Sequence, residues 1–128
     1  MTQRFINNWS GKRLAAALPA GGSTATVPAA DAAQIAAALT DPGDWVRLTL
    51  DDGQGGVEIV RVSAADGSTG ELTLSQRGDE GTTDTDWPAG ALIEARLTAG
   101  TLASLHPDAI LTDGADVLVG SDGLVLTE

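Results

Sequence analysis

The sequence predicts a mainly β protein, a small antiparallel β-sandwich or barrel with one or two short helices and an extended C-terminal tail. Polar and apolar residues alternate over several stretches between residues 45 and 97, as they do in half-buried strands. Segments rich in glycine and aspartate separate these stretches and supply turns. The chain has 128 residues, a length typical of one domain. We therefore expect a β-rich domain over residues 14–105, between an N-terminal docking arm (1–13) and a C-terminal tail or hairpin used in assembly (106–128).

The N-terminal arm is polar but contains two aromatic residues, Phe5 and Trp9. Because chain termini are ordered only when something holds them, we expect the arm to dock either on its own domain or on a neighbouring subunit. Phe5 and Trp9 are thus candidate assembly residues. After the arm, residues 14–18 are compatible with one helical turn, and the β-branched residues at 23–27 indicate a short strand.

Residues 31–39 form the best helix candidate. They are rich in alanine, place Ile35 and Leu39 four residues apart, and begin with Asp31, which suits an N-cap or a first helical turn. Residues 41–44 then contain both proline and glycine and predict a turn.

Two alternating stretches follow. Residues 45–50 predict a strand with one apolar face, made by Val46, Leu48 and Leu50. A glycine-rich loop leads to a second strand over residues 57–63. Its register stays open between an inward pair, Val60 and Val62, and the alternative set Val57, Ile59 and Arg61.

A third strand is expected over residues 71–75, and a fourth over residues 91–97. The connection between them is long and irregular, with Trp87 as its expected anchor. Thr98 is placed to cap a short helix at residues 99–105. The tail then contains two apolar segments separated by Gly-Ser-Asp-Gly, a pattern that suits a hairpin or strands that pair with other chains. Its candidate assembly residues are Leu118, Val119, Leu124, Val125 and Leu126.

Charge and composition argue against several classes of partner. The net charge is −11, and the seven basic residues are scattered, so no basic stripe is present to bind nucleic acid. The same charge disfavours anionic lipid. No cysteine is present, no apolar run approaches the roughly 20 residues of a membrane helix, and the N-terminus lacks the apolar core of a signal peptide. We expect neither a nucleic-acid nor a membrane partner.

The residues do not predict an enzyme or a cofactor. The single histidine, His106, precedes a proline, and no nucleophile or phosphate-binding motif accompanies it. Pairs of aspartates could bind calcium weakly, but turn formation in solvated loops is the preferred interpretation. These acidic groups are Asp41 with Asp44, Asp51 with Asp52, Asp84 with Asp86, and Asp113 with Asp116 and Asp122.

A glycine-rich segment after the third predicted strand is the main candidate site. Its first three residues, Arg77-Gly78-Asp79, spell an adhesion tripeptide, but three residues match often by chance. A structural corner is the better interpretation, with Gly78 and Gly81 at positive φ and Arg77 paired to Glu80. The residues assigned to this corner are Arg77, Gly78, Glu80, Gly81, Thr82 and Trp87.

Four ordered blocks of sequence carry a resemblance to a known family. They are Glu58-Ile59-Val60-Arg61-Val62, Arg77-Gly78-Asp79-Glu80-Gly81-Thr82, Trp87-Pro88-Ala89-Gly90 and Arg96-Leu97-Thr98-Ala99. In this order and spacing they resemble a family of bacteriophage tail-associated virion proteins, with the pattern Arg-Gly-x-Glu-Gly-Thr, Trp-x-Ala-Gly and Arg-Leu-Thr-Ala. The resemblance covers roughly residues 4–105.

The resemblance implies a structural virion protein of the phage tail, in the tail tip, baseplate or fibre connector, assembled in the cytoplasm of the bacterial host. It implies homo-oligomeric assembly, with a trimer as the expected form, and contacts with other tail proteins. Two alternatives remain open. One is a capsid decoration protein, and the other is a host-receptor or carbohydrate-binding module with Trp9, Trp45 or Trp87 as a stacking platform.

Overall fold

A computed structural model of the chain describes residues 3–6 and 8–104. These residues belong to two compact units, one that ends at Arg96 and one that begins at Leu97. The predicted C-terminal tail, with its five candidate assembly residues and His106, lies outside the described residues.

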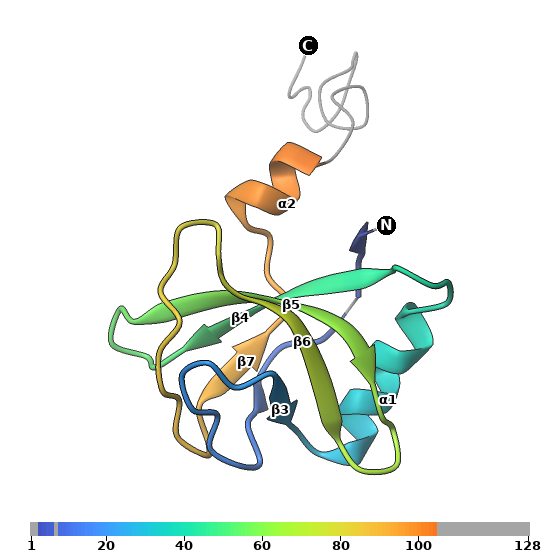
Figure 1. Cartoon of the computed structure of the whole chain (residues 1–128), viewed down its shortest axis with the longest axis horizontal. Coiled ribbons are helices and arrows are strands. Elements are labelled where there is room, and N and C mark those ends of the chain that lie inside the picture. Colours follow the sequence, from blue (N-terminus) through green and yellow to red (C-terminus); the bar gives the residue numbers. More distant parts are fainter. Residues whose placement is uncertain (1–2, 7, 105–128) are drawn as a thin grey trace. The chain divides into compact units, whose positions relative to one another are not determined.

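The first unit is built on one sheet of seven strands with a single helix (Figure 1). Its elements are β1 (Gln3–Arg4), β2 (Lys12–Arg13), β3 (Thr24–Thr26), α1 (Ala29–Ala38), β4 (Trp45–Asp51), β5 (Val57–Ala65), β6 (Glu71–Asp79) and β7 (Leu92–Glu94). The strand order is β2-β7-β4-β5-β6-β3, with β1 paired to β4. All neighbours are antiparallel except β1 and β4, and the sheet curls into a half-barrel. The predicted mainly β class is confirmed.

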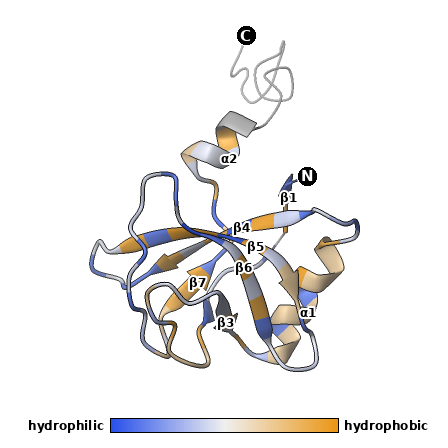
Figure 2. Cartoon of the chain, viewed as in Figure 1, coloured by the Kyte–Doolittle hydropathy of each residue, from blue (hydrophilic) through white to orange (hydrophobic). Residues whose placement is uncertain are grey.

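The alternation in β4 and β5 sets the core. Leu48 of β4 lies opposite Val60 of β5, and Val46 lies opposite Val62. All four side chains are almost completely buried, so the register with Val60 and Val62 inward is the correct one of the two. Figure 2 shows apolar stretches along the central strands and along helix α1.

Helix α1 packs against β5 and β6. It begins after Pro28 and carries Asp31 in its first turn, which is one of the two positions expected for that residue. Ala32 and Ile35 are its buried side chains. The alanine-rich sequence therefore does two things: it favours the helical backbone and lets the helix approach the sheet closely.

The N-terminal segment contributes to its own sheet. β1 runs parallel to the start of β4, and β2 pairs with β7. Trp9, between these strands, is 1% exposed, and its Nε1 donates a hydrogen bond to the Asp31 carbonyl at 3.0 Å. Phe5, in contrast, is 57% exposed.

Three local expectations need correction. Residues 14–18 form no helical turn, because Leu18 is held in an extended bridge to Trp87. The third strand is longer than expected and includes Asp79, whereas β7 ends at Glu94. The corner residues Arg77 and Gly78 therefore belong to a strand and not to the loop after it.

The second unit contains α2 (Ala99–Ser104). The predicted cap is confirmed, since Thr98 Oγ1 accepts a hydrogen bond from the Thr101 amide at 3.0 Å. Within the part of the chain that the structure describes, neither helix has the length and apolar character needed to span a membrane.

Candidate functional site

A β-bulge in β6 organises the corner. Ile59 lies opposite Asp79 and Arg61 lies opposite Gln76, so the single residue Val60 faces two residues, Arg77 and Gly78. In a regular strand Arg77 and Asp79 would point to the same face, because side chains alternate with a period of two. The extra residue reverses the alternation. An earlier irregularity at Ser75, between the pairs Val62–Leu74 and Arg61–Gln76, places Arg77 on the core side of the sheet beside Glu58, and the one opposite Val60 places Asp79 on the other face.

Glu58 lies at the centre of the core-side cluster. Its side chain is completely buried, and its carboxylate accepts five hydrogen bonds, of 2.8 to 3.2 Å. The donors are Arg77 Nε and Nη2, Trp87 Nε1, and the backbone amides of Gly78 and Thr85. We call Glu58 and these four partners the Glu58 cluster. A buried carboxylate is tolerated only when such donors replace its lost hydration.

Arg77 extends the cluster to two loops. Beyond its bidentate contact with Glu58, it donates to the carbonyl oxygens of Pro19, Gly22 and Thr85 at 2.7 to 2.9 Å. Its Nη2 also lies 2.9 Å from Asp84. The expected local pair with Glu80 is wrong, because Glu80 contacts Arg47 at 3.1 Å. The irregular pairing of β5 with β6 explains this, since it places Arg77 on the face opposite to the one that carries Arg47.

The two loops joined in this way are residues 14–23 and 80–91. Leu18 and Trp87 exchange backbone hydrogen bonds at 2.7 and 2.8 Å. Asp84 and Asp86 accept from the backbone amides of Gly21 and Ala20. Trp87 thus anchors the long connection, as predicted, and it does so by binding both Glu58 and the opposite loop.

The turn after the bulge matches the corner prediction. Gly78 has φ = 58° and Gly81 has φ = 79°, so both occupy the left-handed region that glycine tolerates best. Glu80 also has a positive φ, of 54°. The Thr82 hydroxyl donates to the Asp79 carbonyl at 2.7 Å and accepts from the Ile59 amide at 3.0 Å. The hydroxyl therefore fastens this turn to β5.

A second charged cluster lies on the other face of the same strands. The Asp79 carboxylate accepts from Arg47 at 3.1 Å and from Arg61 at 2.9 Å. Both guanidinium groups stack on the Trp45 ring, at 4.9 and 4.2 Å from its centroid. We call Asp79, Arg47, Arg61, Glu80 and Trp45 the Asp79 cluster. Two cations on one aromatic ring, neutralised by two carboxylates, explain how these charges are accommodated.

The electrostatics favour the ionised form of both central carboxylates. Burial alone raises the pKa of Glu58, but the hydrogen bonds from Arg77, Trp87, Gly78 and Thr85 outweigh it and hold the pKa below its ordinary value. Burial likewise raises the pKa of Asp79, and the bonds from Arg61 and Arg47 bring it below normal. The bond to Glu58 raises the pKa of Arg77. These groups carry fixed charges at neutral pH.

The pKa shift of Glu58 does not suit proton transfer. A general acid or base needs a pKa near the working pH, whereas the pKa of Glu58 is shifted away from neutrality. The adhesion interpretation of Arg77-Gly78-Asp79 also conflicts with the structure, because the Arg77 and Asp79 side chains are only 9% and 7% exposed. Both are occupied by partners within the chain.

The aspartate pairs in the described part of the chain act in turns and ion pairs. Asp44 accepts from the Asp41 amide and from Arg4, and Asp52 accepts from the amides of Gln54 and Gly56. Across residues 3–6 and 8–104, no group of three or more His, Cys, Asp or Glu side chains is arranged to hold a metal ion. The last group, Asp113, Asp116 and Asp122, lies outside that range.

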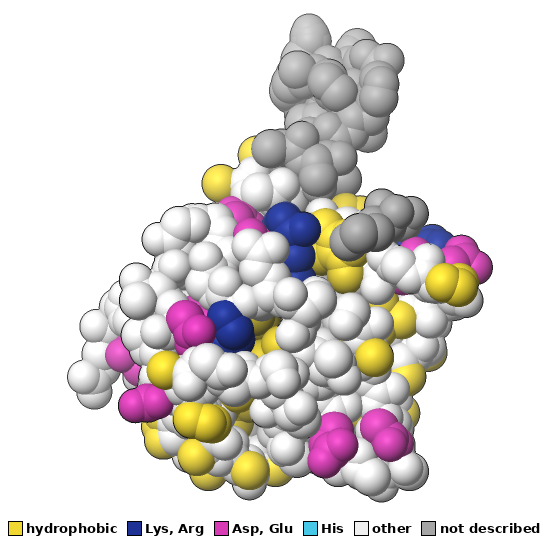
Figure 3. Space-filling view, in the orientation of Figure 1, with side chains coloured by type: hydrophobic (Ala, Val, Ile, Leu, Met, Phe, Trp, Pro, Cys, Tyr) yellow, Lys and Arg dark blue, Asp and Glu magenta, His cyan; other side chains and the backbone are white. Residues whose placement is uncertain are grey.

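The tryptophans do not form an exposed platform. Trp9, Trp45 and Trp87 are 1%, 9% and 5% exposed. Of the assembly candidates, Trp9 is a core residue and Phe5 is on the surface. Figure 3 shows one face of the molecule, on which basic side chains lie next to acidic ones.

The sequence did not identify Glu58 as a residue of the site. It belongs to a resemblance block, but it is not among the residues that the sequence assigns to the corner. A usable signal exists: Glu58 shares the inward alternation with Val60 and Val62, so a carboxylate there must be buried and must find a cationic partner.

No protein-family model matches the chain, and a search of curated protein sequences gave no match.

Proposed function

We propose that the protein is a structural subunit of a bacteriophage tail, in the tail tip, baseplate or fibre connector, and that it acts through homo-oligomeric assembly. One observation supports this most. Three of the four blocks that carry the resemblance, those that contain Glu58, Arg77 and Trp87, meet in a single hydrogen-bonded cluster. The motif thus builds a framework that fixes loop geometry. Arg96 of the fourth block pairs with Asp51 and Glu94 instead.

Two further observations fit a subunit whose surface serves assembly. Phe5 presents an aromatic side chain to solvent beside β1, and Val57 of β5 is 43% exposed. The buried tryptophans count against the alternative of a carbohydrate-binding module that uses them as a stacking platform.

The first experiment measures the mass of the purified protein in solution by light scattering, and then images the intact phage particle with this subunit labelled. We expect a mass of at least twice the 12.9 kDa of one chain, and label on the tail. A stable monomer that binds a sugar tightly would contradict the proposal, and label on the head would select the capsid decoration protein instead.

A matched pair of variants tests the contribution of the exposed aromatic. Phe5→Ser should reduce incorporation into particles. It should not lower the thermal stability of the free protein, because the Phe5 side chain is mostly exposed and contributes little to the core. Gln54→Ser, in an exposed loop of the same sheet, is the control and should assemble normally.

A further inference from the structure

The ion pairs of the described residues leave one basic side chain without an acidic partner. Six of the seven basic residues contact a carboxylate at 2.8 to 3.1 Å; they are Arg4, Lys12, Arg47, Arg61, Arg77 and Arg96. The seventh is Arg13, on the short strand β2. Its side chain is exposed, and its Nη1 donates to the Gly90 carbonyl at 3.0 Å. The other donors of its planar fork remain available for a ligand.

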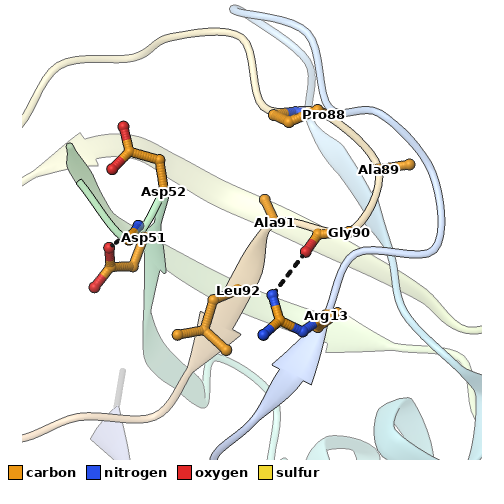
Figure 4. A pocket seen from close by; sticks show the side chains of 9 residues that line it. Arg13, Asp51, Asp52, Pro88, Ala89, Gly90, Ala91 and Leu92 are labelled. Atoms are coloured by element: carbon orange, nitrogen blue, oxygen red, sulfur yellow. Dashed lines mark hydrogen bonds between the residues drawn. The ribbon is translucent and has the colours of Figure 1, made fainter. Parts of the chain in front are cut away.

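Arg13 lines a shallow pocket at this edge of the sheet (Figure 4). The pocket has a volume of about 470 Å³. Arg13 stands on one side, and Asp51 and Asp52 stand on the other, with the apolar side chains of Ala91 and Leu92 between them. A ligand for this pocket would combine a carboxylate for the guanidinium with a small apolar group.

The two aspartates do not compete for Arg13. Asp51 lies 2.9 Å from Arg96 and accepts from the Gly53 amide at 2.7 Å. These contacts lower the pKa of Asp51, and the hydrogen bond from the Gly53 amide contributes most. Asp52 accepts from the backbone of its own turn. Both carboxylates are therefore engaged, and their charge repels any acidic group that enters the pocket away from Arg13.

The C-terminal segment, residues 106–128, has the complementary chemistry. It contains five acidic side chains and neither lysine nor arginine, so it cannot neutralise its own charge. Aspartates in it stand close to apolar runs, as in Asp116-Val117-Leu118-Val119 and Asp122-Gly123-Leu124. Among the ion pairs within residues 3–6 and 8–104, Arg13 is the cation that has no carboxylate of its own.

We propose that the Arg13 pocket binds the C-terminal segment of a second copy of this chain, with a carboxylate on the guanidinium and a neighbouring apolar side chain on Ala91 and Leu92. Arginine recognises carboxylates through two parallel hydrogen bonds. A segment that each copy gives to the next closes a symmetric ring, in which every pocket is filled. This inference rests on the homo-oligomeric assembly proposed above.

The test compares full-length variants in a dilution series followed by analytical ultracentrifugation. Arg13→Glu should weaken self-association at least about fivefold, because it replaces an attraction with a repulsion. The control is the double variant Gln34→Glu, Ala37→Glu on the exposed side of α1, which changes the net charge by the same −2. It should associate within about twofold of the wild type.

A rescue experiment identifies the partner group. Asp116→Arg or Asp122→Arg, placed in the Arg13→Glu background, should restore association for at least one of the two positions. An effect of Arg13→Glu no larger than that of the control would overturn the inference, as would a loss that neither tail variant rescues. A wild-type protein that stays monomeric would instead contradict the proposed function itself.

Discussion

Two carboxylate–arginine clusters share strands β5 and β6 and lie on opposite faces of the sheet, where the pairing of these strands is irregular. In the Glu58 cluster the acid is on β5 and the arginine is on β6; in the Asp79 cluster the order is reversed, with Arg61 on β5. Glu58 is completely buried and binds backbone amides as well as side chains. Asp79 binds two arginines, of which Arg61 keeps 29% of its side chain exposed.

The difference shows how the position of a buried charge decides its role. Glu58 and Arg77 together bind the backbone of residues 14–23 and 80–91, so they determine where these loops lie. Asp79 connects side chains of three strands that are already paired through their backbones. We therefore expect the Glu58 cluster to contribute to stability and loop position, and the Asp79 cluster mainly to stability.

The largest effect is expected for Glu58→Gln. The variant keeps the shape of the side chain but removes the buried carboxylate and leaves the Arg77 guanidinium with only the partly exposed Asp84 as a counter-charge, so the free energy of unfolding should fall by about 3 kcal/mol. Urea denaturation measures it. Glu71→Gln, on the exposed part of β6, is the control and should change stability by less than about 0.5 kcal/mol. Equal losses for the two variants would remove the special role of Glu58.

Asp79→Asn should cost less, about 1 to 2 kcal/mol. Arg47 retains Glu80 as a partner, and Arg61 is partly solvated, so neither cation becomes fully uncompensated. The same denaturation experiment checks this order. If Asp79→Asn proved as costly as Glu58→Gln, the contrast between the two clusters would be wrong.

The dependence of folding stability on acid pH should reveal the contribution of Glu58. Because the pKa of Glu58 is lowered on folding, its contribution to stability is complete above its ordinary pKa of 4.5 and is lost as the pH falls through the lower value of the folded state. Stability should therefore fall steeply below about pH 4.5. The Glu58→Gln variant should show a shallower slope over the same range, and an unchanged slope would show that other carboxylates carry the acid dependence.

The smallest effect is expected at the turn glycines. Gly81 has φ = 79°, and a Cβ added there would meet no other atom within 4 Å, so Gly81→Ala should cost only the left-handed strain of about 1 kcal/mol. A Cβ at Gly78 would lie 2.9 Å from the Thr82 carbonyl oxygen, so Gly78→Ala should cost more. Gly81→Val should be worse than Gly81→Ala, since branched residues rarely adopt positive φ. Thermal melts compare the three variants.

Local pattern was sufficient to predict much of the sheet. The alternation around Leu48 and Val60 identified two central strands, and the alanine-rich stretch near Ile35 identified α1. The helical turn expected before Pro19 was wrong because the conformation of these residues depends on Trp87, nearly 70 residues away. A periodic pattern contains no information about such a partner.

The site was less predictable than the sheet. The glycines at 78 and 81 indicated positive φ, and Trp87 was a clear anchor. The pairing of Arg77 depended on the irregular pairing of β5 with β6, however, because the extra residues in β6 place Arg77 beside Glu58 and not beside Glu80. Likewise, both faces of β4 are buried, although the sequence marked only one of them as apolar.

The Glu58 cluster holds two loops on the sheet. Amide hydrogen exchange of Leu18 and Trp87, which bond to each other, measures this directly against the amides of Leu48 and Val60 in the central strands. In the wild type at neutral pH all four amides should be protected. In Glu58→Gln, Leu18 and Trp87 should lose far more protection than the strand amides. Equal losses at all four positions would contradict the claim.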